Sequence, residues 1–295
     1  KSKTFVKLET LGFSDRDLKV LIHAISQPNG IVLVSGPTGS GKTRIIQDLV
    51  RQFNNNNEKA VIVDIKGDYI SNFYNKDRGD IILNPLDERG ANWSFFEETD
   101  ELRGFDTIAR TLMPDTRGDP FWINAARTVF SELATISKGI IPTAGAFATA
   151  VLRSDTKMIE KYLRNTSAAK LINQDADKTV ACVLMMLSVY LAPLRLYRKE
   201  GNIFSISKWI NDPKAKNILF ISTSPDMKGS LNPLVQLQLD IAITAMCSSK
   251  NKHHNRTWFV LDELAYFDQA IPNLKDGLTM SRSFGGAFIL GIQDL

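Results

Sequence analysis

The chain has 295 residues and 43% of them are hydrophobic, which excludes a disordered chain and predicts a globular protein with a buried core. Lys and Arg number 36 against 32 Asp and Glu, and this mild excess permits an anionic partner without establishing one. No apolar run approaches the roughly 18 to 20 residues that cross a bilayer, and no signal peptide is visible, so we expect the chain as given to be soluble.

The N-terminal region predicts a helix, a strand and a second helix. FSDRDLKVLIHAISQ, residues 13–27, has Ser14 as an N-cap and apolar side chains at helical spacing. GIVLVSG, residues 30–36, is a short β-branched apolar run of strand type, and KTRIIQDLVRQF, residues 42–53, again has helical spacing. A strand, a glycine loop and a helix N-terminus in this order favour a site for anions.

The octet GPTGSGKT between this strand and helix fits the phosphate-binding pattern G-x-x-x-x-G-K-[ST] in full. Its glycines let the backbone turn tightly and bring N–H groups against phosphate oxygens, with no Cβ in the way. Lys42 is predicted to reach the β and γ phosphates, and the hydroxyl of Thr43 is predicted to ligate Mg²⁺. The predicted nucleotide-binding residues are Gly36, Pro37, Thr38, Gly39, Ser40, Gly41, Lys42 and Thr43.

Two further strands follow. AVIVDIKGDY, residues 60–69, begins with an apolar strand, and DIILNP contains another that ends at Pro85. Because strands alternate with helices, the pattern favours an α/β fold with a mostly parallel sheet covered by helices.

Three charged residues come directly after the second strand, beside the expected phosphate loop. Asp64, Lys66 and Asp68 either line the nucleotide site or only form a turn around Gly67.

From about residue 93 the pattern changes, because strand-like alternation is absent until about residue 216. The segments with helical periodicity are WSFFEETDELRGFDTIARTLM, PFWINAARTVFSELATIS, GAFATAVLR, TKMIEKYLRNTSAAKLIN and KTVACVLMMLSVYLAPLRLYRK. Strand character returns in NILFIST, RTWFVLDEL and GGAFILGIQ. We therefore expect a nucleotide-binding domain in two parts, residues 1–92 and 205–295, interrupted by an all-α domain over residues 93–204.

The stretch TWFVLDELAYF is an apolar strand that ends in Asp262 and Glu263, which is a Walker B pattern. In this pattern the aspartate holds the Mg²⁺ shell and the glutamate polarises an attacking water. The predicted sheet is what brings these residues to the phosphate loop, which lies far away in the sequence.

Two single residues are weaker candidates. Gln293 follows the last strand, where open α/β sheets bind ligands, and is either a polar sensor or a loop amide. Arg282, on a predicted helix in TMSRSFGG, either acts as an arginine finger toward a neighbouring subunit or has a structural role.

The two cysteines, Cys182 and Cys247, lie in the apolar stretches ACVLMML and ITAMCSS without the spacing of metal ligands. We expect both to be buried free thiols of a protein in a reducing compartment.

Six segments together resemble the type IV coupling proteins of bacterial conjugation, the TraD/TrwB group. They are VIVDIKGDY, RGDIILNPLDERGANWSFF, DPFWINAARTVFSE, NILFIST, WFVLDEL and SRSFGGAFILGIQ. The match runs in order from about residue 60 to the end, with an interrupting helical region of suitable length.

The resemblance implies a RecA-like P-loop ATPase that uses ATP and Mg²⁺ and assembles as a homo-hexamer at the cytoplasmic face of the inner membrane. Such a ring moves single-stranded DNA, without sequence preference, together with its relaxase toward a type IV secretion channel. By this similarity Lys42 and Thr43 bind phosphate and Mg²⁺, while Asp262 and Glu263 serve metal and water. Gln293 would couple hydrolysis to movement, and the helical region would meet the relaxosome proteins.

Family members carry an N-terminal membrane anchor and continue past the final glutamine, so the resemblance predicts that this chain is a soluble fragment. Residues 11–43, in contrast, look more like the type II secretion and pilus-retraction ATPases, although the acidic and histidine boxes of that group are not evident. This leaves open an ATPase that moves protein subunits. A third possibility is an adaptor in which the nucleotide only sets the assembly state.

Overall fold

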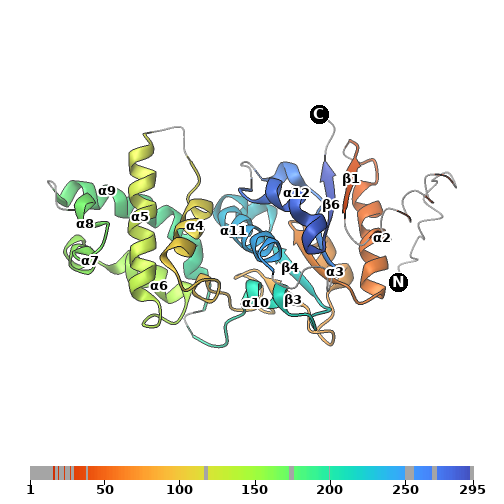
Figure 1. Cartoon of the computed structure of the whole chain (residues 1–295), viewed down its shortest axis with the longest axis horizontal. Coiled ribbons are helices and arrows are strands. Elements are labelled where there is room, and N and C mark those ends of the chain that lie inside the picture. The colour runs from red at the N-terminus through yellow and green to blue at the C-terminus, as the bar shows by residue number, and fades with distance from the viewer. Residues whose placement is uncertain are drawn as a thin grey trace. The chain divides into compact units, whose positions relative to one another are not determined.

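The computed structural model describes residues 16, 19, 23, 27, 30–37, 39–115, 119–172, 176–198, 200–249, 256–267 and 271–292 (Figure 1). The chain forms two compact units. The first comprises Lys1–Ile81, Trp209–Ser224 and Ala242–Leu295, and the second comprises Ile82–Lys208 and Pro225–Ile241. Of the helix predicted over residues 13–27, only residues 16, 19, 23 and 27 are described, and the first three of these are helical.

Within the described residues, a six-stranded sheet has the order β1-β6-β5-β2-β4-β3. In this order β1 and β6, β6 and β5, β5 and β2, and β2 and β4 are parallel pairs, which confirms the predicted α/β fold with a parallel sheet. The strands are β1 (Gly30–Ser35), β2 (Lys59–Asp64), β3 (Ile81–Leu83), β4 (Ile218–Ser222), β5 (Thr257–Leu261) and β6 (Gly286–Ile292). Every residue of β2, β4 and β5 is buried, as is typical of parallel strands covered on both faces.

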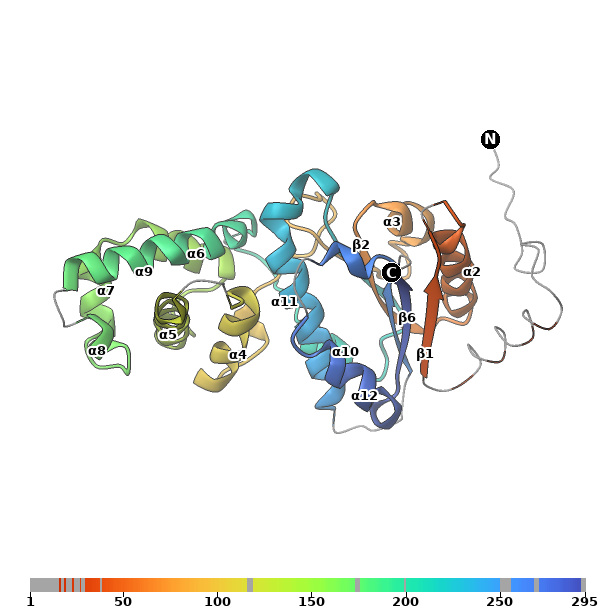
Figure 2. The same ribbon diagram turned by 90° about the horizontal axis from the view of Figure 1, so that it is seen from above.

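Helices cover both faces of the sheet in the first unit. The connection from β1 to β2 runs one way across the sheet and that from β5 to β6 runs the other way, so right-handed crossovers place α2 and α12 on opposite faces. Figure 2 shows this arrangement beside β1 and β6. The helices that lie wholly or partly in this unit are α2 (Lys42–Asn55), α3 (Asp68–Phe73), α10 (Ile206–Asn211), α11 (Lys228–Cys247) and α12 (Leu274–Phe284).

The strand register brings distant segments to one edge of the sheet. Ser35 of β1 pairs with Ile292 of β6, while Leu261 of β5 lies between Val63 of β2 and Leu290 of β6. Because parallel strands share their carboxyl ends, the segments that follow β1, β2 and β5 emerge on the same side. Ligands bind at this edge in open α/β sheets.

The second unit is mainly helical. Between β3 and β4 its described residues contain no strand, only a single bridge between Trp93 and Phe204. The amide N–H of Phe204 donates to the carbonyl of Asn92 at 2.8 Å, so the two ends of the helical region are joined. The α-helices of this region are α4 (Leu102–Leu112), α5 (Pro120–Ser137), α6 (Ala144–Arg153), α7 (Thr156–Leu163), α8 (Ala169–Ile172) and α9 (Ala176–Leu191).

An aromatic cluster forms the core of this unit. Phe95, Phe105, Phe130 and Phe147 come from four different elements, and each is completely buried. Phe95 contacts the other three rings at centroid distances of 6.1, 5.4 and 5.5 Å. Each such pair adds about 0.5 to 1.5 kcal/mol to the burial of the rings, so the cluster holds α4, α5 and α6 together.

The expectation for the cysteines was wrong in one case and only partly right in the other. Both thiols are free, but Cys182 is exposed and Cys247 is half-buried. The buried side chains on α9 include Val180, Val183 and Leu187, and Cys182 points away from that face. Apolar neighbours in the sequence therefore did not indicate burial.

None of the described helices has both the length and the apolar composition needed to span a lipid bilayer.

Candidate functional site

The loop after β1 has the backbone that its glycines predict. Gly36 has φ 153° and Gly41 has φ 88°, both in the region that favours glycine. A Cβ on Gly36 would lie 2.8 Å from Oγ of Ser40, so the loop also needs the space. Gly41 is the N-cap of the 14-residue helix α2, whose positive end therefore faces the loop. A loop of this kind at a helix N-terminus is a site for an anion.

The ammonium group of Lys42 lies over this loop. It donates hydrogen bonds to the carbonyl oxygens of Gly36 and, at 3.2 Å, of Pro37. An anionic acceptor adds Coulomb attraction to the ammonium that a neutral carbonyl oxygen does not supply. A phosphate in the loop would therefore offer Lys42 better acceptors than the two carbonyls.

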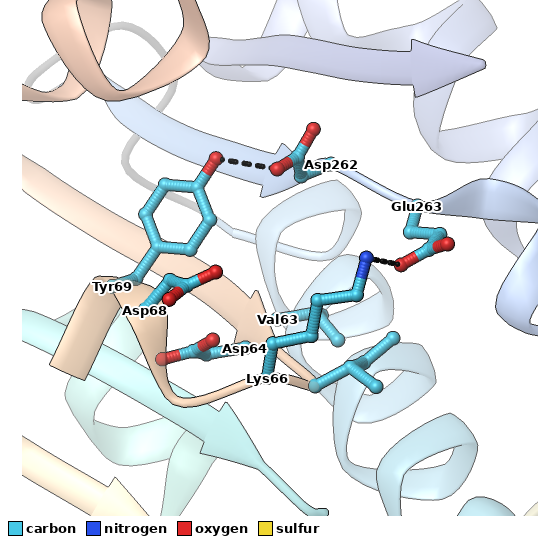
Figure 3. Close-up of a pocket in the computed structure, with 8 residues that line it drawn as sticks. Val63, Asp64, Lys66, Asp68, Tyr69, Asp262 and Glu263 are labelled. Carbon is cyan, nitrogen blue, oxygen red and sulfur yellow. Dashed lines mark hydrogen bonds and ion pairs between the residues drawn. The ribbon is translucent and has the colours of Figure 1, made fainter. Parts of the chain in front are cut away.

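Asp262 directly follows β5 and lies close to residues of α2 and α3. Its carboxylate accepts a hydrogen bond from the hydroxyl of Tyr69 at 2.9 Å (Figure 3). The hydroxyl of Thr43 lies beside the same carboxylate and lowers its pKa. Burial raises the pKa of the Asp262 carboxyl, and both hydroxyls act against this rise. Burial also raises the pKa of Tyr69 well above its usual value, so the phenol stays protonated and remains a donor. Two residues far apart in the sequence, Thr43 and Asp262, are thus in contact.

Glu263 has a different partner. Oε2 of Glu263 lies 2.8 Å from Nζ of Lys66, which follows β2 (Figure 3). This hydrogen bond raises the pKa of Lys66. The lysine therefore stays charged at neutral pH.

A small pocket surrounds these groups, and Asp64 and Asp68 lie in its lining. Asp64 also shapes the turn that follows β2, because its carboxylate accepts the amide N–H of Ile70 at 2.8 Å. Burial raises the pKa of Asp64, whereas its backbone hydrogen bonds lower it. The lining residues are Val63, Asp64, Ile65, Lys66, Asp68, Tyr69, Asp262 and Glu263.

The donor set fits a magnesium ion held together with a nucleotide. Mg²⁺ prefers oxygen ligands and is usually held by one or two protein oxygens, water and substrate phosphates. The hydroxyl of Thr43 and the carboxylate of Asp262 supply such oxygens and already contact each other. In the part of the chain that the structure describes, no three His, Cys, Asp or Glu residues are arranged to hold a metal alone.

Comparison with known proteins decides the family. The family model for the type IV secretion-system coupling protein DNA-binding domain matches residues 23–295. The chain belongs to the type IV coupling protein family. It is 31% identical to the coupling protein TraD of Escherichia coli over 266 residues, which cover 88% of this chain and 37% of TraD.

Solved structures of another family member have the same fold. The plasmid coupling protein TrwB in complex with the ATP analogue ADPNP superposes with a TM-score of 0.79 at 29% identity, over 91% of this chain and 64% of the TrwB chain. TrwB in complex with ADP and Mg²⁺ gives a TM-score of 0.78 over 90% and 64% of the two chains. The chain therefore has the RecA-like P-loop ATPase fold of TrwB, and it spans about two fifths of TraD and less than two thirds of TrwB.

A short segment is also similar to type II secretion proteins, as its sequence suggested. The chain is 60% identical to the type II secretion system protein HxcR of Pseudomonas aeruginosa over 38 residues, 13% of this chain and 8% of HxcR. The coupling protein match is much longer, so it determines the family of the chain.

The structure brings some of the predicted residues together but not all. Lys42 and Thr43 lie at the start of α2, and Asp262 and Glu263 follow β5 at the same edge of the sheet. Arg282 lies in the last turn of α12, is exposed, and is not among the residues that line the pocket. Thr38 and Gln293 lie outside the described residues.

The sequence analysis missed Tyr69. Its ring is 3% exposed, and its hydroxyl contacts the carboxylate that was predicted to hold the metal. The signal for Tyr69 in the sequence is weak, because one uncharged aromatic residue beside Asp64, Lys66 and Asp68 suits a core position equally well.

Proposed function

We propose that the chain is the ATP-hydrolysing part of a conjugative coupling protein and that hydrolysis drives the movement of single-stranded DNA. The observation that carries this proposal is the contact between Thr43 and Asp262, which brings the phosphate loop next to the acidic residues that follow β5. The complexes of TrwB with ADPNP and with ADP and Mg²⁺ support ATP and Mg²⁺ as the ligands.

The loop residues bind and orient the nucleotide. The ammonium of Lys42 leaves the carbonyls of Gly36 and Pro37 for the β and γ phosphates, helped by the N-terminus of α2. Thr43 and Asp262 hold Mg²⁺ through oxygen atoms. When bound, Mg²⁺ neutralises negative charge on the phosphates.

Glu263 accepts a proton from the attacking water. It directly follows Asp262, so a base lies next to the metal-binding oxygens. A carboxylate at this position activates water by general base catalysis, which contributes about 100- to 10,000-fold to a rate.

The remaining parts of the proposal concern the assembly. We propose a homo-hexamer at the cytoplasmic face of the inner membrane, in which Arg282 serves the site of a neighbouring subunit and Gln293 couples hydrolysis to movement. Residues 1–92 and 205–295 would form the nucleotide-binding domain, and residues 93–204 an all-α domain that meets the relaxase and the relaxosome proteins. The family model for a coupling protein DNA-binding domain and the likeness to TraD support DNA and a type IV secretion channel as partners.

ATP hydrolysis by this chain, measured with and without single-stranded DNA at low salt, tests the function. We expect hydrolysis that DNA stimulates, that disappears in Lys42→Ala, and that Glu263→Gln abolishes while ATP still binds. Lys76→Gln, a change at an exposed lysine outside the pocket, is the control and should behave as wild type.

Other results would overturn parts of the proposal. Hydrolysis that is indifferent to DNA would favour the secretion ATPase that moves protein subunits. ATP binding without hydrolysis, at every protein concentration, would favour the adaptor.

The role of Arg282 has its own test, because it requires a neighbouring subunit. Specific activity should rise with protein concentration in the wild type, and Arg282→Ala should remain inactive at high concentration with ATP binding intact. A specific activity that does not change with protein concentration contradicts this role.

A further inference from the structure

Lys66 is the one basic side chain among the residues that line the pocket, where it faces four carboxylates. Its ammonium lies 2.8 Å from Oε2 of Glu263, and its side chain is 57% exposed. Asp262 and Asp68 also attract this ammonium. Figure 3 shows the lysine reaching across the pocket to the glutamate.

The two acidic residues after β5 are held in different ways. Asp262 accepts a hydrogen bond from the hydroxyl of the buried Tyr69, and the hydroxyl of Thr43 lies beside it, so neutral groups fix its position. A metal ligand benefits from this, because such partners orient it without competing for its charge. Glu263 instead pairs with a cation on a long, exposed side chain. This ion pair holds the Glu263 carboxylate in place, and it can be broken.

We propose that Lys66 is a positioning residue that restrains ATP hydrolysis by holding Glu263 in an ion pair. This inference rests on the proposed function, in which Glu263 accepts a proton from water. A carboxylate oxygen that already accepts the ammonium hydrogen bond is not available to the water. Hydrolysis then requires that the lysine leave the glutamate.

The surroundings of Lys66 allow this release. Lys66 lies in the bend between β2 and α3, and the next residue, Gly67, has φ 76°. The ammonium can therefore turn toward solvent without disturbing the buried strand. An exposed ion pair of this kind is weak, so the cost of breaking it is small compared with a catalytic barrier.

The test compares steady-state ATP hydrolysis by the wild type, Lys66→Gln and Lys66→Arg in the full chain. We expect Lys66→Gln to raise kcat without DNA by about threefold to tenfold, with KM for ATP within about twofold, as fits the loss of a weak ion pair. Lys66→Arg keeps the cation and should stay near wild type. Lys76→Gln again serves as the matched control, and melting temperatures establish that each variant is folded.

Two further variants separate this inference from the proposed function. Glu263→Gln and the double variant Lys66→Gln/Glu263→Gln should be equally inactive, because the lysine acts only through the glutamate. If hydrolysis requires Glu263 but Lys66→Gln leaves kcat unchanged or lowers it, the restraint is overturned and the proposed function stands. If Glu263→Gln hydrolyses ATP as well as wild type, the proposed function itself fails.

Discussion

The hydroxyl of Tyr69 donates a 2.9 Å hydrogen bond to Oδ2 of Asp262, although 193 residues separate the two in the sequence. Tyr69 lies in the first turn of α3, and Asp262 directly follows β5. Since Thr43 at the start of α2 also lies beside Asp262, three segments of the chain meet at one carboxylate. The orientation of this carboxylate is therefore fixed by the fold itself.

Tyr69→Phe should slow ATP hydrolysis and raise the Mg²⁺ concentration that it needs, each by about 10- to 100-fold, the usual effect of losing a partner that orients a metal ligand. The ring remains in its buried position, so the variant should stay folded. Hydrolysis measured over a range of Mg²⁺ concentrations, together with circular dichroism, checks both expectations. Tyr74→Phe, a change of the same kind outside the pocket lining, is the control. A normal Mg²⁺ dependence in Tyr69→Phe would show that Thr43 alone suffices to orient Asp262.

Gly291→Ala should disturb the same carboxylate from the other side. A Cβ on Gly291 would lie 2.1 Å from the carbonyl oxygen of Asp262 and 2.9 Å from its Oδ1. A backbone atom cannot turn away as a side chain can, so we expect a loss of about 1 to 3 kcal/mol in stability. A displacement of about 1 Å can cost about 100-fold in rate, so hydrolysis should also fall at least tenfold.

Melting temperature and ATP hydrolysis measured on Gly291→Ala check this prediction. Gly229→Ala is a suitable control, because a Cβ there meets no atom within 4 Å and the residue lies in helix α11. It should be neutral or slightly stabilising. Full activity in a folded Gly291→Ala would mean that β6 can shift without moving Asp262.

Local patterns predicted much of the fold. The glycine loop, the apolar strands and the helices after residue 93 all follow from periodicity and turn chemistry within short windows. Helix α2 shows this well, because Ile46, Leu49, Val50 and Phe53 are buried at the spacing of one helix face. The sheet that the two motifs require also forms, and the segments after β1 and β5 emerge at the same edge of it.

The features that the sequence did not predict depend on tertiary contacts. The pairing of Lys66 with Glu263 and the contact of Tyr69 with Asp262 need β2 and β5 to be neighbours, which no local pattern indicates. The local pattern does not predict helix α11 either. Its buried polar residues Gln238 and Asp240 interrupt an apolar face, and such positions become favourable only through partners elsewhere, such as the hydroxyl of Thr111 for Asp240.

Lys59 gives the first unit a measurable pH dependence. Its side chain is 3% exposed, and its ammonium donates to the carbonyls of Trp209, Ile210 and Asp212 at 3.1, 2.8 and 2.7 Å, near the end of α10. Burial lowers the pKa of Lys59 to about 8, with the charge of Asp212 acting in the opposite direction. Below pH 8 the lysine is protonated in both the folded and the unfolded chain, so the cost of burying its charge is fully present.

Between about pH 8 and 10.5 the folded chain releases this proton while the unfolded chain keeps it, so folding becomes more favourable as the pH rises. From pH 7.5 to 9.5 the wild type should gain about 2 kcal/mol in the free energy of unfolding relative to Lys59→Met. Urea unfolding of both proteins at several pH values measures the difference. A difference that stays constant over this range would place the pKa near its ordinary value.

Glu98 should matter to the second unit, because its carboxylate accepts the indole N–H of Trp93 at 2.9 Å and the amide N–H groups of Ile206 and Ser207 at 2.8 and 2.9 Å. The two amides begin α10 and have no partner within that helix.

Glu98→Gln replaces one acceptor oxygen by an NH₂ group that faces a donor, so it should cost about 1 to 3 kcal/mol in the free energy of unfolding. The neighbouring Glu97 provides the matched control, because it pairs with Lys208, whose side chain is 72% exposed. Glu97→Gln should therefore change stability by less than about 0.5 kcal/mol. Thermal unfolding followed by tryptophan fluorescence compares the two variants. If both lower the stability equally, the negative charge near the start of α10, and not the hydrogen bonds of Glu98, is what stabilises this end of the helix.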